Sequence, residues 1–327
     1  MKFSDQILSW YQHNKRELPW RKGTSYQVFL SEVMLQQTQV KTVIPFFHRF
    51  LERFPNLSTL ANSSLDEVYQ VWQGLGYYHR ARNMHKTAQI WSALGRDPRN
   101  YAEWIALPGV GPYTASILTA ILLEHPAAAI DGNIKRILQR YFGLETIKEV
   151  KMVAENVLPS KNYGNYTQGL MDLGAMICTP KTPKCSMCPI AEFCKFKQGT
   201  WMPSKKAKNL KSVRYGHVYL CKKEDALWSV KNTESKLLKG LWGFPLSDLK
   251  EEEQSSYIEV PLTCLKGTVR HVFTHFILEL RIWNATSRIE DVTSKWSNGK
   301  WLDFQQRKEL GFSRLMRKIE EQENIWI

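Results

Sequence analysis

Residues 107–118 read LPGVGPYTASIL, a stretch in which glycines and prolines stand immediately before an apolar run. Gly109 and Gly111 allow a tight turn whose backbone amides face outward, and Pro112 suits the first position of the helix that follows. Amides without partners at the start of a helix bind phosphate well. The same sequence also fits a corner between two helices that binds no ligand. Other features of the chain are needed to distinguish a phosphate-binding turn from such a corner.

Four of the six cysteines follow in one short stretch with the spacing C-x6-C-x2-C-x5-C. They are Cys178, Cys185, Cys188 and Cys194. Thiols this close together indicate a metal or cluster site rather than a disulfide framework. The spacing leaves the metal open, because zinc sites favour two CxxC pairs whereas one CxxC flanked by single ligands also suits a [4Fe–4S] cube. With such a site behind it in a basic helical region, the turn at Gly109, Val110 and Gly111 is predicted to bind DNA phosphates.

The composition is that of a globular protein with a polyanionic partner. The 327 residues are enough for two hydrophobic cores, 43% of them are hydrophobic, and the net charge is +14. The opening sequence MKFSDQILSW has no apolar segment of signal-peptide length, and no stretch reaches the roughly 18 apolar residues of a membrane span. We therefore expect a protein of the reducing cytoplasm, associated with the nucleoid and not with a membrane.

The periodicity of the chain changes near residue 200. Before that point, residues 27–41 and 112–123 have the apolar spacing of buried helices. After it, VRYGHVYL, ALWSV and residues 276–282 alternate at period two, which predicts strands. The closing segment FSRLMRKIEEQ is predicted to be helical again.

This change predicts a mostly α fold in two domains joined by a linker. We expect a helical domain over residues 1–198 and a smaller α+β domain over residues 213–327. The linker over residues 199–212 contains basic residues that could lie along DNA. They are Lys205, Lys206, Lys208 and Lys211.

Two carboxylates stand next to apolar residues. Glu32 lies in VFLSEVMLQQ, and its neighbours about one helical turn away are Val28, Phe29 and Leu35. Burial there would raise the pKa of Glu32 and let it hold a proton near neutrality, as a general acid requires. Asp131 ends the apolar run AAAI before a predicted helix, where a plain N-cap is a common role, and a cap could still face a substrate. A proton donor paired with a carboxylate is what glycosidic-bond cleavage through an oxocarbenium-like state requires.

Several motifs together resemble the adenine DNA glycosylase family. They are SEVMLQQTQV, GLGYYHRARN, LPGVGPYTA, DGNIKRIL, MDLGAMICTP and the cysteine loop. The family comprises helix–hairpin–helix, iron–sulfur repair enzymes that remove adenine mispaired with 8-oxoguanine. The resemblance runs from Trp20 to Cys194 and resumes more weakly at LLKGLWGFP and RHVFTHF. It implies a helix–hairpin–helix glycosylase domain with a [4Fe–4S] cluster on the four cysteines, followed by a Nudix-like domain.

The resemblance also implies roles for single residues around the adenine. Glu32 matches the general acid that protonates adenine N7, and Asp131 matches the acid that stabilises or traps the sugar cation, with Asn133 as a polar partner. The adenine pocket would be lined by Trp20, Arg21, Leu35 and Gln168.

The lesion is expected to be read by residues from elsewhere in the chain. Gln37 and Tyr77 match residues that enter the base stack, the tyrosine beside the oxidised guanine. A Phe-Ser-His loop of the family corresponds to Phe273, Thr274 and His275, so that threonine replaces serine. The implied partner is double-stranded DNA with A:8-oxoguanine or A:G mispairs, and we expect a monomer.

Tyr113 separates this sequence from the endonuclease III type, in which a lysine at that position attacks the sugar and then cleaves the strand. Tyrosine cannot form a Schiff base, so the sequence predicts a glycosylase without a strong lyase step. The second domain lacks the acids of a Nudix box, so we expect no nucleotide hydrolysis there. The alternatives are a bifunctional pyrimidine-lesion glycosylase of the endonuclease III type and a non-catalytic zinc-containing DNA-binding protein.

Overall fold

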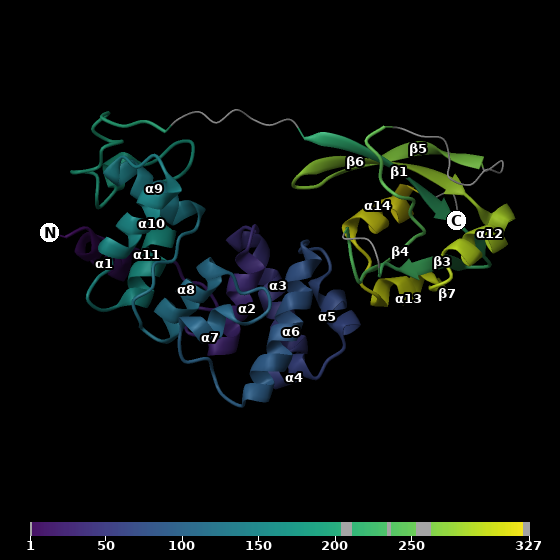
Figure 1. Cartoon of the computed structure of the whole chain (residues 1–327), viewed down its shortest axis with the longest axis horizontal. Coiled ribbons are helices and arrows are strands. Elements are labelled where there is room, and N and C mark those ends of the chain that lie inside the picture. The colour runs from purple at the N-terminus through teal and green to yellow at the C-terminus, as the bar shows by residue number, and fades with distance from the viewer. Residues whose placement is uncertain (1, 204–210, 234–236, 253–262, 323–327) are drawn as a thin grey trace. The chain divides into compact units, whose positions relative to one another are not determined.

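The computed structural model describes residues 2–203, 211–233, 237–252 and 263–322 (Figure 1). Contacts divide the chain into two compact units. The first comprises residues 1–62 and 83–206, and the second comprises residues 63–82 and 207–327. A short segment from the first half of the sequence is thus grouped with the C-terminal part. Of the linker lysines singled out above, Lys205, Lys206 and Lys208 lie outside the described residues.

The described part of the first unit is helical, as the periodicity predicts. Its helices are α1 (Phe3–Asn14), α2 (Ser25–Leu35), α3 (Val40–Arg53), α4 (Leu57–Ala61), α6 (Tyr78–Leu94, with its first residues in the other unit), α7 (Tyr101–Ile105), α8 (Pro112–Leu122), α9 (Gly132–Phe142), α10 (Ile147–Asn156) and α11 (Tyr163–Met176). A 3-10 turn, η1 (Cys185–Met187), lies in the cysteine loop. Capping boxes fix the starts of α2 and α10, at Thr24 with Gln27 and at Thr146 with Glu149.

The prediction of one helix over residues 27–41 is wrong at its C-terminal end. Helix α2 ends at Leu35 and α3 begins at Val40, and between them Gln37 has a φ of 57°. The run QQTQ carries no apolar side chain that could continue the buried face of α2, so nothing stabilises a further helical turn there. The predicted helix over residues 112–123 is confirmed as α8.

Helix α11 organises the part of this unit that holds the candidate site. It packs against α1, α8 and α9, and small residues allow the close approach. A Cβ atom on Gly169 would lie 3.0 Å from Ile7 of α1, and one on Gly174 would lie 2.6 Å from the Cβ of Asn133 on α9. The buried side chains of Ile137, Leu138 and Leu173 belong to the core that these helices share. Helices α9 and α11 are therefore held at a fixed distance.

The second unit contains the predicted strands. One sheet has the order β1-β6-β5, in which β1 (Ser212–Leu220) runs parallel to β6 (Phe276–Asn284) and β5 (Thr263–Val272) antiparallel to it. The other sheet contains β2 (Lys222–Lys223), β3 (Ala226–Lys231), β4 (Trp242–Gly243) and β7 (Gly299–Leu302). The helical elements are α5 (Leu65–Trp72), η2 (Thr286–Arg288), α12 (Ile289–Lys295), α13 (Phe304–Glu309) and α14 (Arg314–Gln322). The predicted C-terminal helix is thus confirmed.

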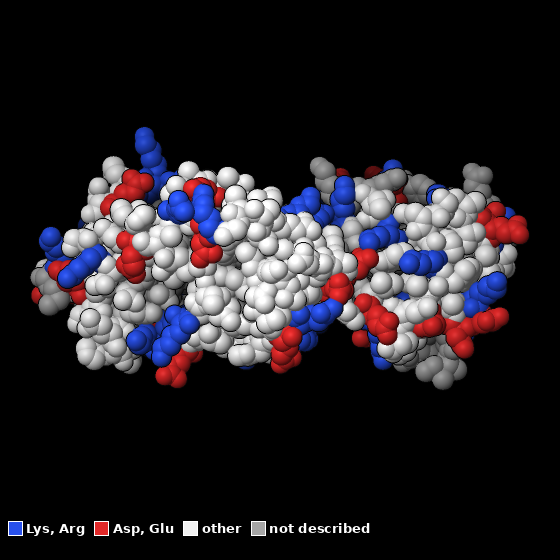
Figure 2. All heavy atoms as spheres, turned by 90° about the horizontal axis from the view of Figure 1, so that it is seen from below, with Lys and Arg blue, Asp and Glu red and all other residues white. Residues whose placement is uncertain are grey.

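Alternation along the strands explains the core of this unit. Leu278, Leu280 and Ile282 of β6 are buried and share one cluster with Phe312 and with Ile319 of α14. No helix in the described ranges is long and apolar enough to cross a membrane. On the face shown in Figure 2, Lys and Arg side chains are interspersed with Asp and Glu and do not gather into one patch.

Candidate active site

A cavity of about 590 Å³ in the first unit collects eight of the predicted site residues. They are Trp20, Arg21, Glu32, Leu35, Tyr113, Asp131, Asn133 and Gln168. Helices α2, α8, α9 and α11 each contribute at least one of them. The cavity is large enough for a nucleobase and its sugar.

Glu32 is the buried acid of this cavity. Its residue is 4% exposed, on the helix α2, whose other side chains from Val28 to Met34 are also buried. Burial raises the pKa of Glu32 to about 7; the hydrogen bond from Tyr113 works against this rise and the charge of Asp131 adds to it. The Tyr113 hydroxyl donates to Glu32 Oε2 at 3.3 Å. At neutral pH this carboxyl group therefore has a proton to give.

Asp131 is both the N-cap of α9 and a wall of the cavity. One carboxylate oxygen accepts from the Ile134 amide at 2.7 Å, and the other accepts from Asn133 Nδ2 at 2.9 Å. Asn133 is itself held by Arg136, whose Nη2 donates to Asn133 Oδ1 at 2.8 Å. Arg136 also donates to the carbonyl oxygen of Cys178 at 2.7 Å. A chain of hydrogen bonds thus joins the orientation of Asp131 to the backbone of the cysteine loop.

Sequence reasoning missed a second buried acid, Asp172 of α11. Its side chain is fully buried and accepts from Arg16 Nε and from Arg21 Nη2, each at 2.7 Å. Arg16 lines the cavity together with Arg21. The sequence did contain a sign that Asp172 is buried, because it interrupts the apolar segment GLMDLGAM in the same way that Glu32 interrupts the apolar residues of α2. Asp172 holds the two guanidinium groups at the wall of the cavity.

The turn at residues 107–111 has the geometry expected of a hairpin. Gly109 has a φ of 76°, and a Cβ atom there would lie 2.6 Å from the Cβ of Asn83, so glycine is required on both counts. The Val110 amide donates to the Leu107 carbonyl oxygen at 3.1 Å and is used within the turn. Gly111 is the N-cap of α8 and has no side chain to cap it; because Pro112 has no amide hydrogen, the amides left for an external acceptor are those that follow it in the first turn.

The four cysteines of the loop line one small cavity together with apolar side chains of α9. None of the four forms a disulfide, and burial raises the pKa of Cys188 to about 11, with a smaller upward effect from the other three cysteines, so a thiolate there at neutral pH needs a cation beside it. Thiolates grouped in this way need cationic metal to balance them. No three potential ligands in the described part of the chain lie close enough to share a single ion. Four thiols around one cavity fit a cluster in which each thiolate binds a different iron.

Arg140 of α9 ties this loop to the helical core. Its guanidinium donates to the carbonyl oxygens of Thr179 and Pro180 at 2.8 and 2.9 Å and lies 3.4 Å from Cys178 Sγ. The backbone amide of Phe196 donates to the Arg140 carbonyl oxygen at 2.9 Å. The cysteine loop is therefore fixed at both ends to the helix that begins at Asp131.

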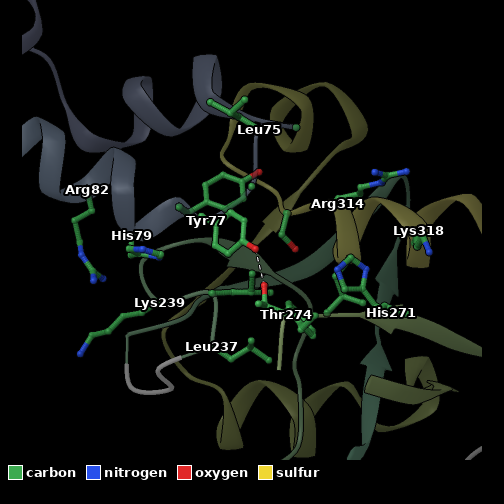
Figure 3. Close-up of a pocket in the computed structure, with 18 of the residues that line it drawn as sticks. Leu75, Tyr77, His79, Arg82, Leu237, Lys239, His271, Thr274, Arg314 and Lys318 are labelled. Carbon is green, nitrogen blue, oxygen red and sulfur yellow. Dashed lines mark hydrogen bonds between the residues drawn. The ribbon is translucent and has the colours of Figure 1, made fainter. Parts of the chain in front are cut away.

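The residues expected to read the lesion lie outside this cavity. Tyr77 and Thr274, both in the second unit, share a hydrogen bond of 2.5 Å between their hydroxyl groups (Figure 3). Phe273 is stacked on Phe276 with ring centroids 4.9 Å apart. His275 is exposed and does not line the cavity of Figure 3. Gln37, also exposed, lines neither cavity and occupies the positive-φ position between α2 and α3.

Family models match three parts of the chain. Residues 30–160 match the HhH-GPD superfamily of base excision DNA repair proteins, residues 178–194 the iron–sulfur binding domain of endonuclease III, and residues 216–322 the NUDIX domain. These matches confirm the predicted fold class and the iron–sulfur cofactor.

Relatives of known name match over nearly the whole length. The chain is 37% identical to an adenine DNA glycosylase of Buchnera aphidicola subsp. Schizaphis graminum over 97% of either chain. It is 36% identical to the adenine DNA glycosylase of Buchnera aphidicola subsp. Acyrthosiphon pisum over 97% of this chain and 96% of that one. Among solved structures, a thermostable thymine-DNA glycosylase is similar with a TM-score of 0.56 and 28% identity, over 60% of this chain and 95% of that one.

Proposed function

The chain belongs to the adenine DNA glycosylase family, and we propose that it hydrolyses the N-glycosidic bond of adenine mispaired with 8-oxoguanine or guanine in duplex DNA. The observation that carries the proposal is the cavity in which Glu32, with a pKa raised to about 7, stands across from Asp131. A protonated acid and a carboxylate on one cavity are the two groups that glycosidic-bond cleavage requires.

In the proposed reaction the adenine leaves the base stack and enters the cavity of the first unit. Glu32 protonates the base at N7, which makes it a better leaving group. Asp131, oriented by Asn133, stabilises the positive charge that develops on the sugar, and water completes the hydrolysis. Trp20, Leu35 and Gln168 would line the base, and the hairpin amides would hold a phosphate. The cluster, when bound, would order the basic loop against the DNA rather than take part in bond cleavage.

The rate of excision should fall as pH rises above about 7, because Glu32 must be protonated to act. Replacing Tyr113 by phenylalanine removes a hydrogen bond that lowers the pKa of Glu32, so this fall should move to higher pH. The single-turnover rate is measured from pH 5.5 to pH 9 in steps of about half a pH unit. Steps of this size resolve a pKa shift of about one unit, which is usual for a side chain in a folded protein. Tyr101→Phe, on the exposed side of α7, is the matched control. An unchanged profile in Tyr113→Phe would separate the hydroxyl from the titration of Glu32.

The same acid has a defined effect on stability. The pKa of Glu32 lies above its ordinary value of 4.5 in the folded chain, so the folded state binds more protons than the unfolded state between pH 4.5 and about 7. The contribution of Glu32 to the free energy of unfolding should therefore decrease as the pH rises across this window. Glu32→Gln removes that contribution.

Tyr113 faces Glu32 with a hydroxyl where a lyase would need an amine. An amine is required to form the Schiff base through which a lyase cleaves the strand. We expect borohydride to trap no strong covalent adduct between this protein and a duplex that carries A:8-oxoguanine. A bifunctional endonuclease III-type enzyme run beside it supplies the positive control. Efficient trapping would mean that another amine of the chain attacks the sugar.

The identity of the opposite base is tested by single-turnover excision from duplexes with adenine opposite 8-oxoguanine, guanine or thymine. Tyr77 and Thr274, whose hydroxyl groups share a hydrogen bond, are the two groups that we propose contact the oxidised base. We expect the highest rate opposite 8-oxoguanine, a lower one opposite guanine and little excision opposite thymine. Equal rates on all three duplexes would show that the protein excises adenine without recognising the oxidised guanine.

A further inference from the structure

A second cavity, of about 670 Å³, lies within the second unit and carries an excess of positive charge (Figure 3). Five of its lining residues are cationic, two are histidines, and no aspartate or glutamate is among the described residues that line it. The cations are Arg82, Lys239, Arg270, Arg314 and Lys318. Tyr77, Tyr78 and Phe273 contribute aromatic rings to the same walls. Cationic and aromatic groups around one hollow of this size are typical of a site for a nucleotide.

Two of these cations lie one helical turn apart on α14. Arg314 is exposed and Lys318 is half-buried, and Figure 3 shows both on the helix that borders the cavity. Arg270 pairs with Glu279 at 3.5 Å, whereas no ion pair joins Arg314 or Lys318 to any carboxylate in the described ranges. Like charges four residues apart on a helix repel each other. An anion bound between them would remove that repulsion.

His271 faces the same two cations from β5. Its Nδ1 atom is buried and has no hydrogen-bond partner among the described residues. Burial lowers the pKa of His271, and the charges of Lys318 and Arg314 lower it further, so the ring is neutral at pH 7. The ring packs on Phe273 with centroids 4.6 Å apart. His271 thus brings to the wall of the cavity a neutral imidazole with one buried nitrogen that has no hydrogen-bond partner in the described residues.

We propose that Arg314, Lys318 and His271 bind a nucleotide phosphate on the strand that carries the oxidised guanine. The inference rests on the proposed function, because it places that strand against Tyr77 and Thr274 on the same cavity. The paired cations of α14 supply the charge, and the imidazole supplies a hydrogen bond. Such a contact fixes the register of the strand, so that the base beside the phosphate comes to the two hydroxyl groups.

The test compares Arg314→Gln/Lys318→Gln with Lys223→Gln/Lys308→Gln, which removes two positive charges from exposed positions of the same unit outside this cavity. Affinity is measured by fluorescence anisotropy at several salt concentrations on a duplex with 8-oxoguanine opposite a 2′-fluoro-adenosine that resists cleavage. Arg314→Gln/Lys318→Gln, the α14 variant, should bind about tenfold more weakly, as expected for loss of charged hydrogen bonds. Its plot of log affinity against log salt should be shallower by about one unit. The control variant should change affinity by no more than about twofold.

Neutral methylphosphonates then locate the phosphate. Each phosphate within two nucleotides of the oxidised guanine is replaced in turn. One replacement should weaken binding by the native protein about as much as the α14 variant does, and should cost that variant nothing further. Additive losses at every position would overturn the proposal, as would equal binding by the α14 and control variants.

Free nucleotide distinguishes the two sources of the same phosphate. If 8-oxo-deoxyguanosine monophosphate competes with the duplex for the native protein but not for the α14 variant, the site also binds the phosphate of a free nucleotide. If the nucleotide does not compete while the methylphosphonate effect holds, the ligand is the phosphate of the strand. Competition that the α14 variant keeps in full would contradict a phosphate site at these residues. Excision of unmodified adenine by the native protein is measured in parallel. If the native protein excises no adenine, the proposed function is wrong. If it excises adenine but the α14 variant binds the duplex as tightly as the native protein, only the phosphate site is wrong.

Discussion

Replacing Glu32 by glutamine should slow adenine excision by roughly 10²–10⁴-fold, the usual contribution of a general acid. Glutamine has nearly the same shape and can still accept the hydrogen bond from Tyr113, so the cavity should keep its form. It has no acidic proton to give to the leaving base. The measurement is single-turnover excision at pH 6.5, together with the affinity for the mismatch duplex, which should change little.

Glu155→Gln is the matched control for this substitution. Glu155 is an exposed residue of α10 and does not line the cavity. Its loss should leave the rate unchanged. Turnover by Glu32→Gln at the rate of the control would show that another group protonates the adenine.

Replacing Asp131 by asparagine should slow excision by about 10²–10³-fold, the usual effect of removing one group that stabilises developing charge. Asparagine is as good an N-cap as aspartate, so α9 should keep its first turn. Its amide nitrogen cannot accept the hydrogen bond from Asn133, so the melting temperature should fall, but by less than in a variant that also loses the cap. The loss then falls on the chemistry, because the sugar cation no longer faces a negative charge. Rate and melting temperature are measured on the same preparations.

Asp131→Ala separates the two roles of this residue. Alanine removes both the charge and the cap, and losing an N-cap costs about 1 kcal/mol of stability. We expect this variant to be as slow as Asp131→Asn but less stable. If Asp131→Asn excised adenine at the native rate while only Asp131→Ala lost stability, Asp131 would be a helix cap and nothing more.

The two carboxylates could be predicted from sequence because each violates a local pattern. Glu32 interrupts an apolar helix face, and Asp131 ends an apolar run before a helix, so burial and capping follow from neighbours within one turn. The hairpin at residues 107–111 is similarly local, since its glycines and proline define the turn by themselves. Their meeting on one cavity required the family resemblance, because nothing in the spacing of residues 32 and 131 brings them together.

The features that sequence did not predict depend on contacts between distant segments. The buried site of Asp172 joins α11 to arginines about 150 positions earlier, and the grouping of residues 63–82 with the C-terminal unit joins segments separated by more than a hundred residues. The break between α2 and α3 was missed because four polar residues fit a helix as readily as a loop. The cationic cavity beside α14 also could not be predicted from the sequence. Nothing in the residues around Arg314 and Lys318 distinguishes them from charged residues on a solvated helix face.

Infrared difference spectroscopy measures directly whether Glu32 holds a proton near neutrality. The stretching band of a protonated carboxyl group, isolated by subtracting the spectrum of Glu32→Gln, is followed from pH 5 to pH 9. We predict that it is present at pH 5.5 and disappears with a midpoint at about 7. A band already absent at pH 5.5, as for a glutamate of ordinary pKa, would show that Glu32 is ionised there and is not the proton donor.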